Sequence, residues 1–202
     1  PRFENENIPQ YKSRTTRYKS EGGDMLILNE KTLAIGISKR TDPRAIEALA
    51  KNLFEANTSF ETILAFNIPK TRAFMHLDTV LTQVDYGKFT IHPGIMKDLT
   101  VIEVLKTTGG EFKVNKVITT LEEILEKHLH VPVTLLNIGG NDMITSGREQ
   151  WKDGANTLAI APGVVIVYER NHVTNEILRE QGIKVIEIPS SELYRGRGGP
   201  RC

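Results

Sequence analysis

Short apolar runs and one amphipathic segment follow each other near the beginning of the chain. Residues 25–28 and 32–37 are apolar and are separated by a turn-like Asn-Glu-Lys, which predicts a β-hairpin. We expect a helix next, because Asp42 can cap it, Pro43 suits its first turn and apolar residues then recur at helical spacing. Residues 62–68 read as a buried strand, so the predicted order is strand, strand, helix, strand.

The same order returns near the end of the chain. Residues 157–161 and 164–168 flank a Pro-Gly turn and predict a second hairpin. A helix is expected over 173–181, where Gly182 ends it, and a strand over 183–188. The segments that precede the two helices are also similar, which indicates an internal repeat.

The middle of the chain fits a looser third copy. Its predicted elements are strands at 81–84, 89–92 and 101–105, a helix at 120–129 and a strand at 133–138. One such unit cannot bury its apolar face alone, so stacked or radial packing is expected. We therefore predict one α/β domain of about three units, at roughly residues 20–70, 76–140 and 150–202, with an open edge.

Composition narrows the class of protein. The 202 residues are 39% hydrophobic and 25% charged, which is typical of a globular domain. A net charge of +1 provides no field for nucleic acid or an anionic membrane, and no apolar run is long enough to span a bilayer. We expect a cytoplasmic protein. The chain begins at Pro1 and ends at Cys202 directly after a glycine-rich stretch, so we interpret it as a fragment.

Two short segments carry polar groups that a core would not select. Glu21-Gly22-Gly23-Asp24 places two acids around two glycines before a strand, although a solvated turn would look similar. His76-Leu77-Asp78-Thr79 would place His76 and Asp78 on one face of an alternating strand. A histidine beside a carboxylate can transfer protons and bind a cation, and a hydrogen-bonded core pair is the alternative.

The closing stretch, residues 195–202, surrounds the single cysteine with three arginines and three glycines. Nearby guanidinium charge lowers the pKa of a thiol and favours a reactive thiolate. The alternative interpretation of this stretch is a disordered basic terminus. No metal-ligand spacing, phosphate-binding loop or serine nucleophile motif is present, so chemistry without a cofactor is predicted. A thiol, a histidine and carboxylates suit attack on a cationic electrophilic carbon. His92, His128, His130 and His172 are expected to be surface or structural residues.

Together with Arg148-Glu149-Gln150-Trp151 and Asp153-Gly154, these motifs resemble bacterial arginine deiminases along the whole chain. The resemblance implies a five-bladed, pseudo-symmetric α/β propeller built of ββαβ units, the pentein fold of guanidine-modifying enzymes. It also implies hydrolysis of the guanidinium group of free L-arginine to L-citrulline and ammonia, in arginine catabolism. Members of this family are about twice as long as this chain, so we expect the N-terminal half of the same enzyme as a partner and no activity from this part alone. We also expect a homo-oligomer.

The same resemblance implies the roles of single residues. Cys202 would be the nucleophile that forms a thiouronium intermediate, and His76 the general acid and base. Glu21 would be the glutamate beside this histidine.

Substrate binding is assigned in the same way. Asp78 would grip the guanidinium nitrogens, while Arg40 and Arg197 would hold the α-carboxylate. Two alternatives stay open. One is another guanidine-modifying enzyme, namely a dimethylarginine hydrolase, an amidinotransferase or an agmatine deiminase, although the two arginines argue against agmatine, which has no carboxylate. The other is a non-catalytic binding or surface fragment.

Overall fold

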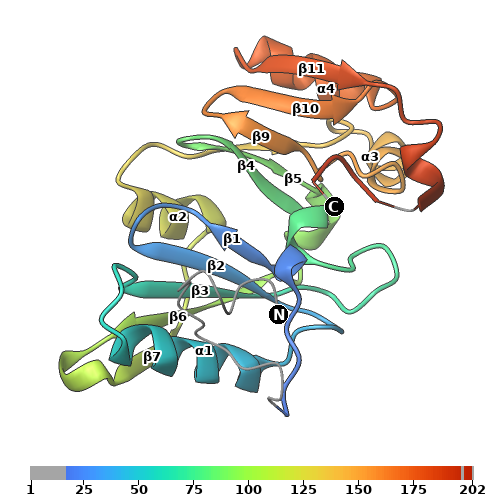
Figure 1. Cartoon of the computed structure of the whole chain (residues 1–202). Coiled ribbons are helices and arrows are strands. Elements are labelled where there is room, and N and C mark those ends of the chain that lie inside the picture. Colours follow the sequence, from blue (N-terminus) through green and yellow to red (C-terminus); the bar gives the residue numbers. More distant parts are fainter. Residues whose placement is uncertain (1–16, 197, 202) are drawn as a thin grey trace, which may run out of the picture.

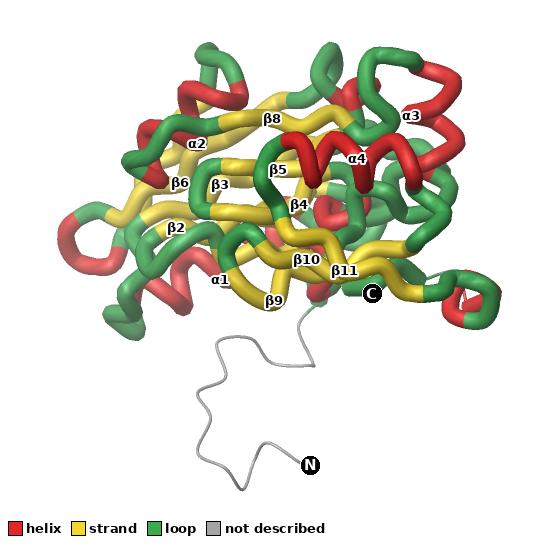
Figure 2. The backbone as a smooth tube through the Cα atoms, turned by 90° about the horizontal axis from the view of Figure 1, so that it is seen from above, coloured by secondary structure: helices red, strands yellow, loops and turns green. Residues whose placement is uncertain are grey.

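The computed structural model describes residues 17–196 and 198–201, and Figure 1 shows them as sheets flanked by helices. The described residues form one five-stranded and two three-stranded sheets, so the predicted α/β class is confirmed. In the view from above, the strands gather in the middle of the molecule and the helices lie toward its outside (Figure 2). No helix in the described part of the chain is long and apolar enough to cross a membrane.

The first unit matches its sequence prediction closely. Strand β1 (Met25–Ile27) pairs antiparallel with β2 (Thr32–Ile37), and β2 pairs parallel with β3 (Thr62–Asn67). Helix α1 (Pro43–Glu55) makes the crossover, and the side chain of Asp42 caps it by accepting from the backbone N–H of Arg44. The apolar positions of the helix are its buried ones, as its spacing predicts.

Strands β2 and β3 are almost continuously apolar because both faces of their sheet are covered. Leu33, Ile35 and Ile37 of β2 pack in a core with α1. Ala34, between them, faces a second core that the sheet shares with the next unit. Alternate residues of one strand therefore fill two different cores.

The second and third units repeat this pattern. In the second, β4 (Leu81–Asp85) pairs antiparallel with β5 (Lys88–Ile91), which pairs parallel with β8 (Thr134–Asn137) after helix α2 (Leu121–Leu129).

In the third unit, β9 (Leu158–Ala161) pairs antiparallel with β10 (Val164–Tyr168), and β10 pairs parallel with β11 (Lys184–Ile188) after helix α4 (His172–Glu180). A smaller core joins this unit to the second through Val84.

The sequence prediction assigned the strand at residues 101–105 to the wrong unit. Strand β6 (Thr100–Lys106) does not belong to the middle sheet but pairs antiparallel with β3 and extends the first sheet. A local pattern predicts a strand without saying which free edge it joins. Two further elements escaped prediction: β7 (Phe112–Lys116), which pairs with β6 and is mostly polar, and α3 (Met143–Gln150), which buries only a short polar face.

The segments that carry the candidate chemistry lie directly before first strands. A 3₁₀ turn at Gly22–Asp24 precedes β1, and another at Leu77–Thr79 precedes β4. Residues of β1, β4 and β9 also line one common pocket of about 420 Å³. The first strand of each unit therefore faces a shared region of the molecule.

Candidate functional site

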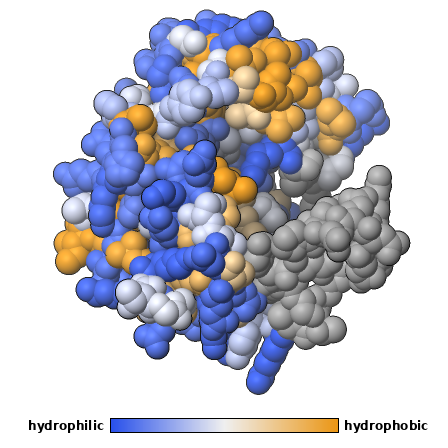
Figure 3. All heavy atoms as spheres, turned by 60° about the vertical axis from the view of Figure 1, so that its left-hand side comes forward, coloured by the Kyte–Doolittle hydropathy of each residue, from blue (hydrophilic) through white to orange (hydrophobic). Residues whose placement is uncertain are grey.

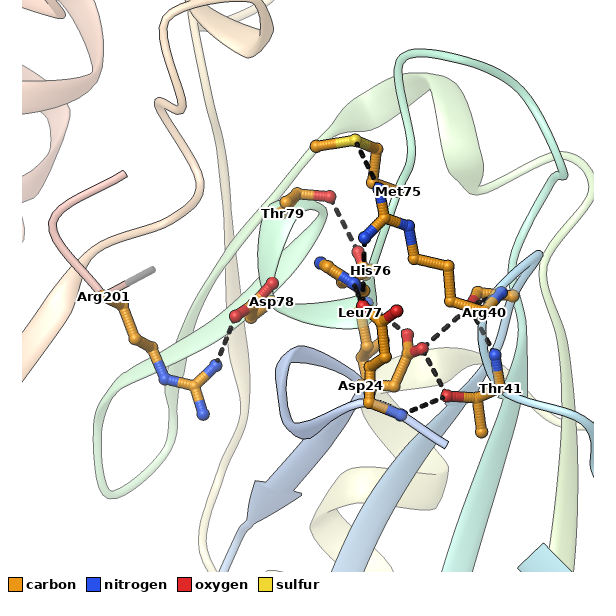
Figure 4. A network of polar contacts seen from close by, with 11 residues as sticks. Asp24, Arg40, Thr41, Met75, His76, Leu77, Asp78, Thr79 and Arg201 are labelled. Carbon is orange, nitrogen blue, oxygen red and sulfur yellow. Dashed lines mark hydrogen bonds and ion pairs between the residues drawn. The ribbon is translucent and has the colours of Figure 1, made fainter. Parts of the chain in front are cut away.

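Glu21, Arg40 and His76 meet although they come from three separate segments of the chain. The Nε2 atom of His76 lies 2.5 Å from Oε2 of Glu21, and Nη1 of Arg40 donates to the same oxygen at 3.1 Å. Figure 4 shows Arg40 reaching toward this histidine from the turn after β2. An acid, a base and a fixed cation thus form one cluster.

The carboxyl group of Glu21 is held in its ionised form. Burial opposes this, but hydrogen bonds from His76 and Arg40 outweigh it and lower the pKa of Glu21 below its ordinary value. A carboxylate at 2.5 Å from Nε2 fixes the orientation of the imidazole ring.

His76 and Asp78 do lie close together, but not on an alternating strand, so that prediction was wrong. His76 occupies the N-cap position of the 3₁₀ turn Leu77–Thr79, without a capping hydrogen bond from its side chain, and this turn replaces the expected extended backbone. Gly23 leaves the space in which the two side chains lie. A Cβ atom on Gly23 would lie 3.0 Å from Nδ1 of His76 and 3.2 Å from Oδ2 of Asp78, so a side chain here would press on both.

Asp78 is almost completely buried and is paired with a cation of the same chain. Its Oδ2 accepts from Nη1 of Arg201 at 3.0 Å, and Arg201 also donates its backbone N–H to Asn156 and its Nη2 to the carbonyl of Met25. Burial raises the pKa of Asp78, and the nearby charge of Arg201 opposes the rise. The described chain therefore ends beside Asp78, at the residue before Cys202.

Two atoms of this cluster have unused hydrogen-bonding capacity. Within the described residues, Nδ1 of His76 and Oδ1 of Asp78 are buried and have no partner. Leaving such atoms unpaired is unfavourable by about 1–3 kcal/mol each, so a fold keeps them mainly where something else completes the contacts. The arrangement suits a polar ligand that binds between the histidine and the carboxylate.

A pocket of about 460 Å³ opens beside the turn that carries Asp78. Its lining includes Met75, Thr79 and Asp153, and it is also bordered by Arg72, Ala73, Gln150, Trp151 and Arg195. Burial, and then the charge of Asp78, raise the pKa of Asp153 to about 6. The pocket thus combines a carboxyl group with guanidinium groups next to the cluster.

The remaining predictions about side chains have different outcomes. Arg197 and Cys202 lie outside the described residues. His92 and His128 are structural, as predicted: Nδ1 of His92 accepts from Gly94, and Nε2 of His128 lies 2.7 Å from Glu103. In the described part of the chain, no group of three or more His, Cys, Asp or Glu side chains is arranged to hold a metal ion.

Sequence reasoning named Asp24 only as one acid of a motif and Arg201 only as one of three arginines near the thiol, and it did not consider Asn156. Asp24 is fully buried and receives hydrogen bonds from the turn that carries Arg40. Asn156 receives the backbone N–H of Arg201 and donates to the carbonyl of Asp78. The sequence offered one signal for Asp24: an acid directly before a buried strand, together with the hydroxyl residues Ser38 and Thr41 on either side of Arg40, is an unusual set of polar residues for a buried unit.

Comparison with known proteins identifies a family for the whole chain. The family model "Arginine deiminase" matches residues 1–202. Arginine deiminases of Clostridium perfringens (strain SM101 / Type A) and Bacillus cereus (strain ATCC 10987) are each 55% identical to the chain, over 205 and 207 residues. Each alignment covers 100% of this chain and 50% of the relative, so the chain spans about half the length of these curated relatives.

Solved structures share the fold at low identity. A binary complex of an AgrE mutant with L-arginine has a TM-score of 0.57 at 18% identity, over 89% of this chain and 22% of that one. The inosamine-phosphate amidinotransferase of Streptomyces griseus has a TM-score of 0.58 at 14% identity, over 97% of this chain and 49% of that one. The fold is therefore the pentein fold of amidinotransferases and dihydrolases. With a family model that matches its whole length, the chain belongs to the arginine deiminase family.

Proposed function

We propose that the protein containing this chain hydrolyses the guanidinium group of L-arginine to L-citrulline and ammonia, and that this chain supplies the nucleophile, the acid-base pair and one guanidinium-binding acid. The observation that carries the proposal is the Glu21–His76 pair beside buried Asp78, with one unpaired polar atom on each of His76 and Asp78. Membership in the arginine deiminase family supports it.

In the proposed reaction, the thiolate of Cys202 attacks the guanidinium carbon, and His76 donates a proton to the departing nitrogen, so that ammonia leaves. A covalent S-alkylthiouronium remains. His76 then accepts a proton from water, which attacks the same carbon, and the carbon–sulfur bond breaks to release citrulline and the thiol. Glu21 stabilises the positive charge on the imidazole during both steps, because its carboxylate lies 2.5 Å from Nε2.

Substrate binding would use charge at both ends of L-arginine. Asp78 receives the guanidinium group, and its existing contact with the guanidinium of Arg201 supports this, because the same oxygen already binds a group of that shape. Arg40 and Arg197 hold the α-carboxylate. Arg201 is anchored beside Asp78 and directly precedes Cys202 in the chain, which supports delivery of the thiol to this site.

We also propose that the chain forms three blades of a five-bladed propeller. The common pocket lined by β1, β4 and β9 supports a radial arrangement, because the first strand of each unit then faces one axis. The other half of the longer protein would supply the two remaining blades and the rest of the substrate contacts.

The test is citrulline formation from L-arginine by the full-length protein, with agmatine and methylated arginine as competing substrates. We expect turnover of L-arginine alone, and its loss by at least about 1000-fold in Cys202→Ala and His76→Ala. His172→Ala is the matched control, because His172 is exposed. Full activity of Cys202→Ala would contradict the mechanism.

Recognition of the α-carboxylate is tested separately. Arg40→Ala is expected to raise KM for L-arginine by at least about tenfold, since a charged hydrogen bond is lost. The neighbouring and exposed Lys39→Ala serves as the control. Equal effects of the two substitutions would mean that Arg40 does not hold the substrate.

A further inference from the structure

Asp24 has a fully buried carboxylate that is surrounded by donors from its own chain. Its Oδ2 accepts from Oγ of Ser38 at 2.7 Å and from Oγ1 of Thr41 at 2.6 Å, and its Oδ1 accepts from the backbone N–H of Leu77 at 2.9 Å. Figure 4 shows this carboxylate between the Thr41 turn and Leu77. Its oxygens face these three donors, so its effect on chemistry must be indirect.

The two hydroxyl groups pass this contact on to residues of the proposed site. Oγ of Ser38 accepts the backbone N–H of Arg40 at 3.0 Å, and Oγ1 of Thr41 accepts the backbone N–H of Glu21 at 3.1 Å. Each hydroxyl therefore donates to Asp24 and accepts from the segment that carries a site residue.

The third donor leads to the histidine. Leu77 directly follows His76, so the bond from its N–H to Asp24 fixes the backbone at the point where the imidazole begins. One carboxylate thereby connects the backbones at Glu21, Arg40 and His76, which are far apart in the sequence.

A glycine provides the room for this arrangement. A Cβ atom on Gly36, in the buried strand β2, would lie 2.5 Å from Oδ1 of Asp24 and 2.9 Å from Cβ of Leu77. Glycine weakens a strand interior, and it is tolerated where another group must come close to the backbone. The close approach of Asp24 and Leu77 is thus built into the sheet itself.

We propose that Asp24 is a positioning residue of the site, which sets Arg40 through Ser38 and the Glu21–His76 pair through Thr41 and Leu77. The inference deepens the proposed function and rests on it. Asp24→Asn would break part of this arrangement, because its single amide oxygen can accept either from the N–H of Leu77 or from the two hydroxyl groups, and the –NH₂ group can accept from neither. Substitutions at Ser38 and Thr41 remove the two hydroxyl connections one at a time.

We expect loss of the Ser38 connection and loss of the Thr41 connection to have different kinetic effects in the full-length protein. Ser38→Ala is expected to raise KM for L-arginine about tenfold, because it loosens Arg40. It should lower kcat less than Thr41→Val does, although not leave it untouched, because Arg40 also donates to Glu21 and Oγ of Ser38 also accepts the backbone N–H of Thr41. Thr41→Val is expected to lower kcat about tenfold and to leave KM nearly unchanged, because it loosens Glu21. Thr41→Ser keeps the hydroxyl and should restore kcat. Asp24→Asn should change both constants.

Asp42→Asn is the matched control, because it makes the same chemical change on an aspartate outside this network and asparagine also caps helices well. Its kinetic constants are expected to match those of the wild type. Equal losses of kcat in all variants, in proportion to the folded protein that remains and with KM constant, would mean that Asp24 only stabilises the fold. That result would overturn the inference.

A second measurement does not depend on turnover. Crystal structures of the full-length variants are compared at the Glu21–His76 contact, where Nε2 of His76 lies 2.5 Å from Oε2 of Glu21. We expect this distance to lengthen in Asp24→Asn and Thr41→Val and to stay unchanged in Asp42→Asn. If it lengthens while no variant, wild type included, hydrolyses L-arginine, the proposed function fails and the positioning role stands. An unchanged distance together with no kinetic split overturns the positioning role.

Discussion

At the scale of single residues, Gly22 and Gly23 are neighbours in one turn but differ in what surrounds them. A Cβ atom on Gly22 would meet nothing within 4 Å, whereas one on Gly23 would press on the ring of His76 and on the carboxylate of Asp78. The motif Glu-Gly-Gly-Asp therefore contains one glycine whose lack of a side chain leaves space for the site. The sequence alone could not distinguish the two, because the difference arises from a segment that lies more than fifty residues away.

This pair offers a matched test of the geometry in the full-length protein. Gly23→Ala is expected to lower kcat for L-arginine at least about tenfold, because His76 and Asp78 must each shift by a few tenths of an ångström. Gly22→Ala should leave kcat within about twofold of the wild type. The measurement is steady-state kinetics of both variants, and similar effects of the two would show that the contact with Gly23 is unimportant.

Asp153 is a second residue whose environment only the fold reveals. Its pKa rises from 3.8 to about 6 through burial and the charge of Asp78. Between about pH 4 and pH 6, the folded protein therefore binds more protons at this group than the unfolded chain does. The free energy of unfolding contributed by Asp153 accordingly falls as pH rises through this window and stays lower above it.

Asp153→Asn is expected to remove this dependence. The variant should be more stable than the wild type at pH 7, by on the order of 1 kcal/mol once solvent screening of a partly exposed group is allowed for. Asparagine also tolerates the positive φ of 58° at this position. Urea unfolding at pH 4 and pH 7 measures the effect, with the exposed Asp98→Asn as the control. A larger advantage at pH 4 than at pH 7 would contradict the assignment.

At the scale of elements, a buried glutamate joins the first sheet to the helix of the second unit. Glu103 on β6 is 4% exposed and accepts from Nζ of Lys127 at 2.5 Å and from Nε2 of His128 at 2.7 Å, both on α2. Asn115 of β7 donates to its other oxygen at 3.2 Å. Burial opposes ionisation of Glu103, but these hydrogen bonds prevail and lower its pKa.

The linkage gives a stability prediction with a defined sign. Because the folded pKa of Glu103 is depressed, its stabilising contribution is complete above the unfolded value near 4.5 and is lost as pH falls through the folded value. Glu103→Gln should therefore lower the free energy of unfolding at pH 7 by about 1–3 kcal/mol, and the difference should shrink toward pH 3. Thermal or urea unfolding at both pH values checks this, with exposed Glu47→Gln as the control. A constant difference across pH would exclude the ionised contact as its cause.

Strand β6 also illustrates what element-level prediction can and cannot reach. Its strand character follows from residues 100–106 alone. The cap of α1 and the hairpins of the first and third units likewise follow from their own local sequences. The partner of β6 does not, because β3 presents a free edge that competes with the edges of the middle sheet and local propensity is the same for both. The segment with His76 failed for a related reason: a short alternating pattern fits a strand and a 3₁₀ turn equally well.

At the scale of the whole molecule, the shared pocket is bordered by side chains that would favour burial. Three large apolar side chains of this pocket are strongly exposed to solvent: Ile27 of β1 at 71%, Tyr86 in the turn after β4 at 71% and Ile160 of β9 at 54%. Figure 3 shows that hydrophilic side chains dominate one face of the molecule and that apolar side chains gather in separate areas of it. Exposed apolar residues next to a shared pocket are typical of a surface that another part of a protein covers.

We therefore expect residues 1–202 alone to self-associate and to lack deiminase activity. Coexpression with the half that the relatives carry in addition should give a defined complex and restore citrulline formation. Light scattering of the separate and coexpressed chains measures this, and Ile27→Lys with Ile160→Lys should reduce self-association of residues 1–202. A stable monomer of residues 1–202 would contradict the expectation.

The sequence by itself determined the α/β class, most strands and helices, the family and the candidates Glu21, Arg40, His76 and Asp78. These depend on local periodicity, capping and short motifs, which neighbouring residues carry together. Only the tertiary structure decided the edge that β6 joins, the contacts of Gly23 and Gly36, and the role of Asp24 as a common acceptor. Each of these depends on atoms that approach within about 3 Å from distant segments, where close packing and hydrogen-bond geometry decide the outcome and local pattern carries no signal.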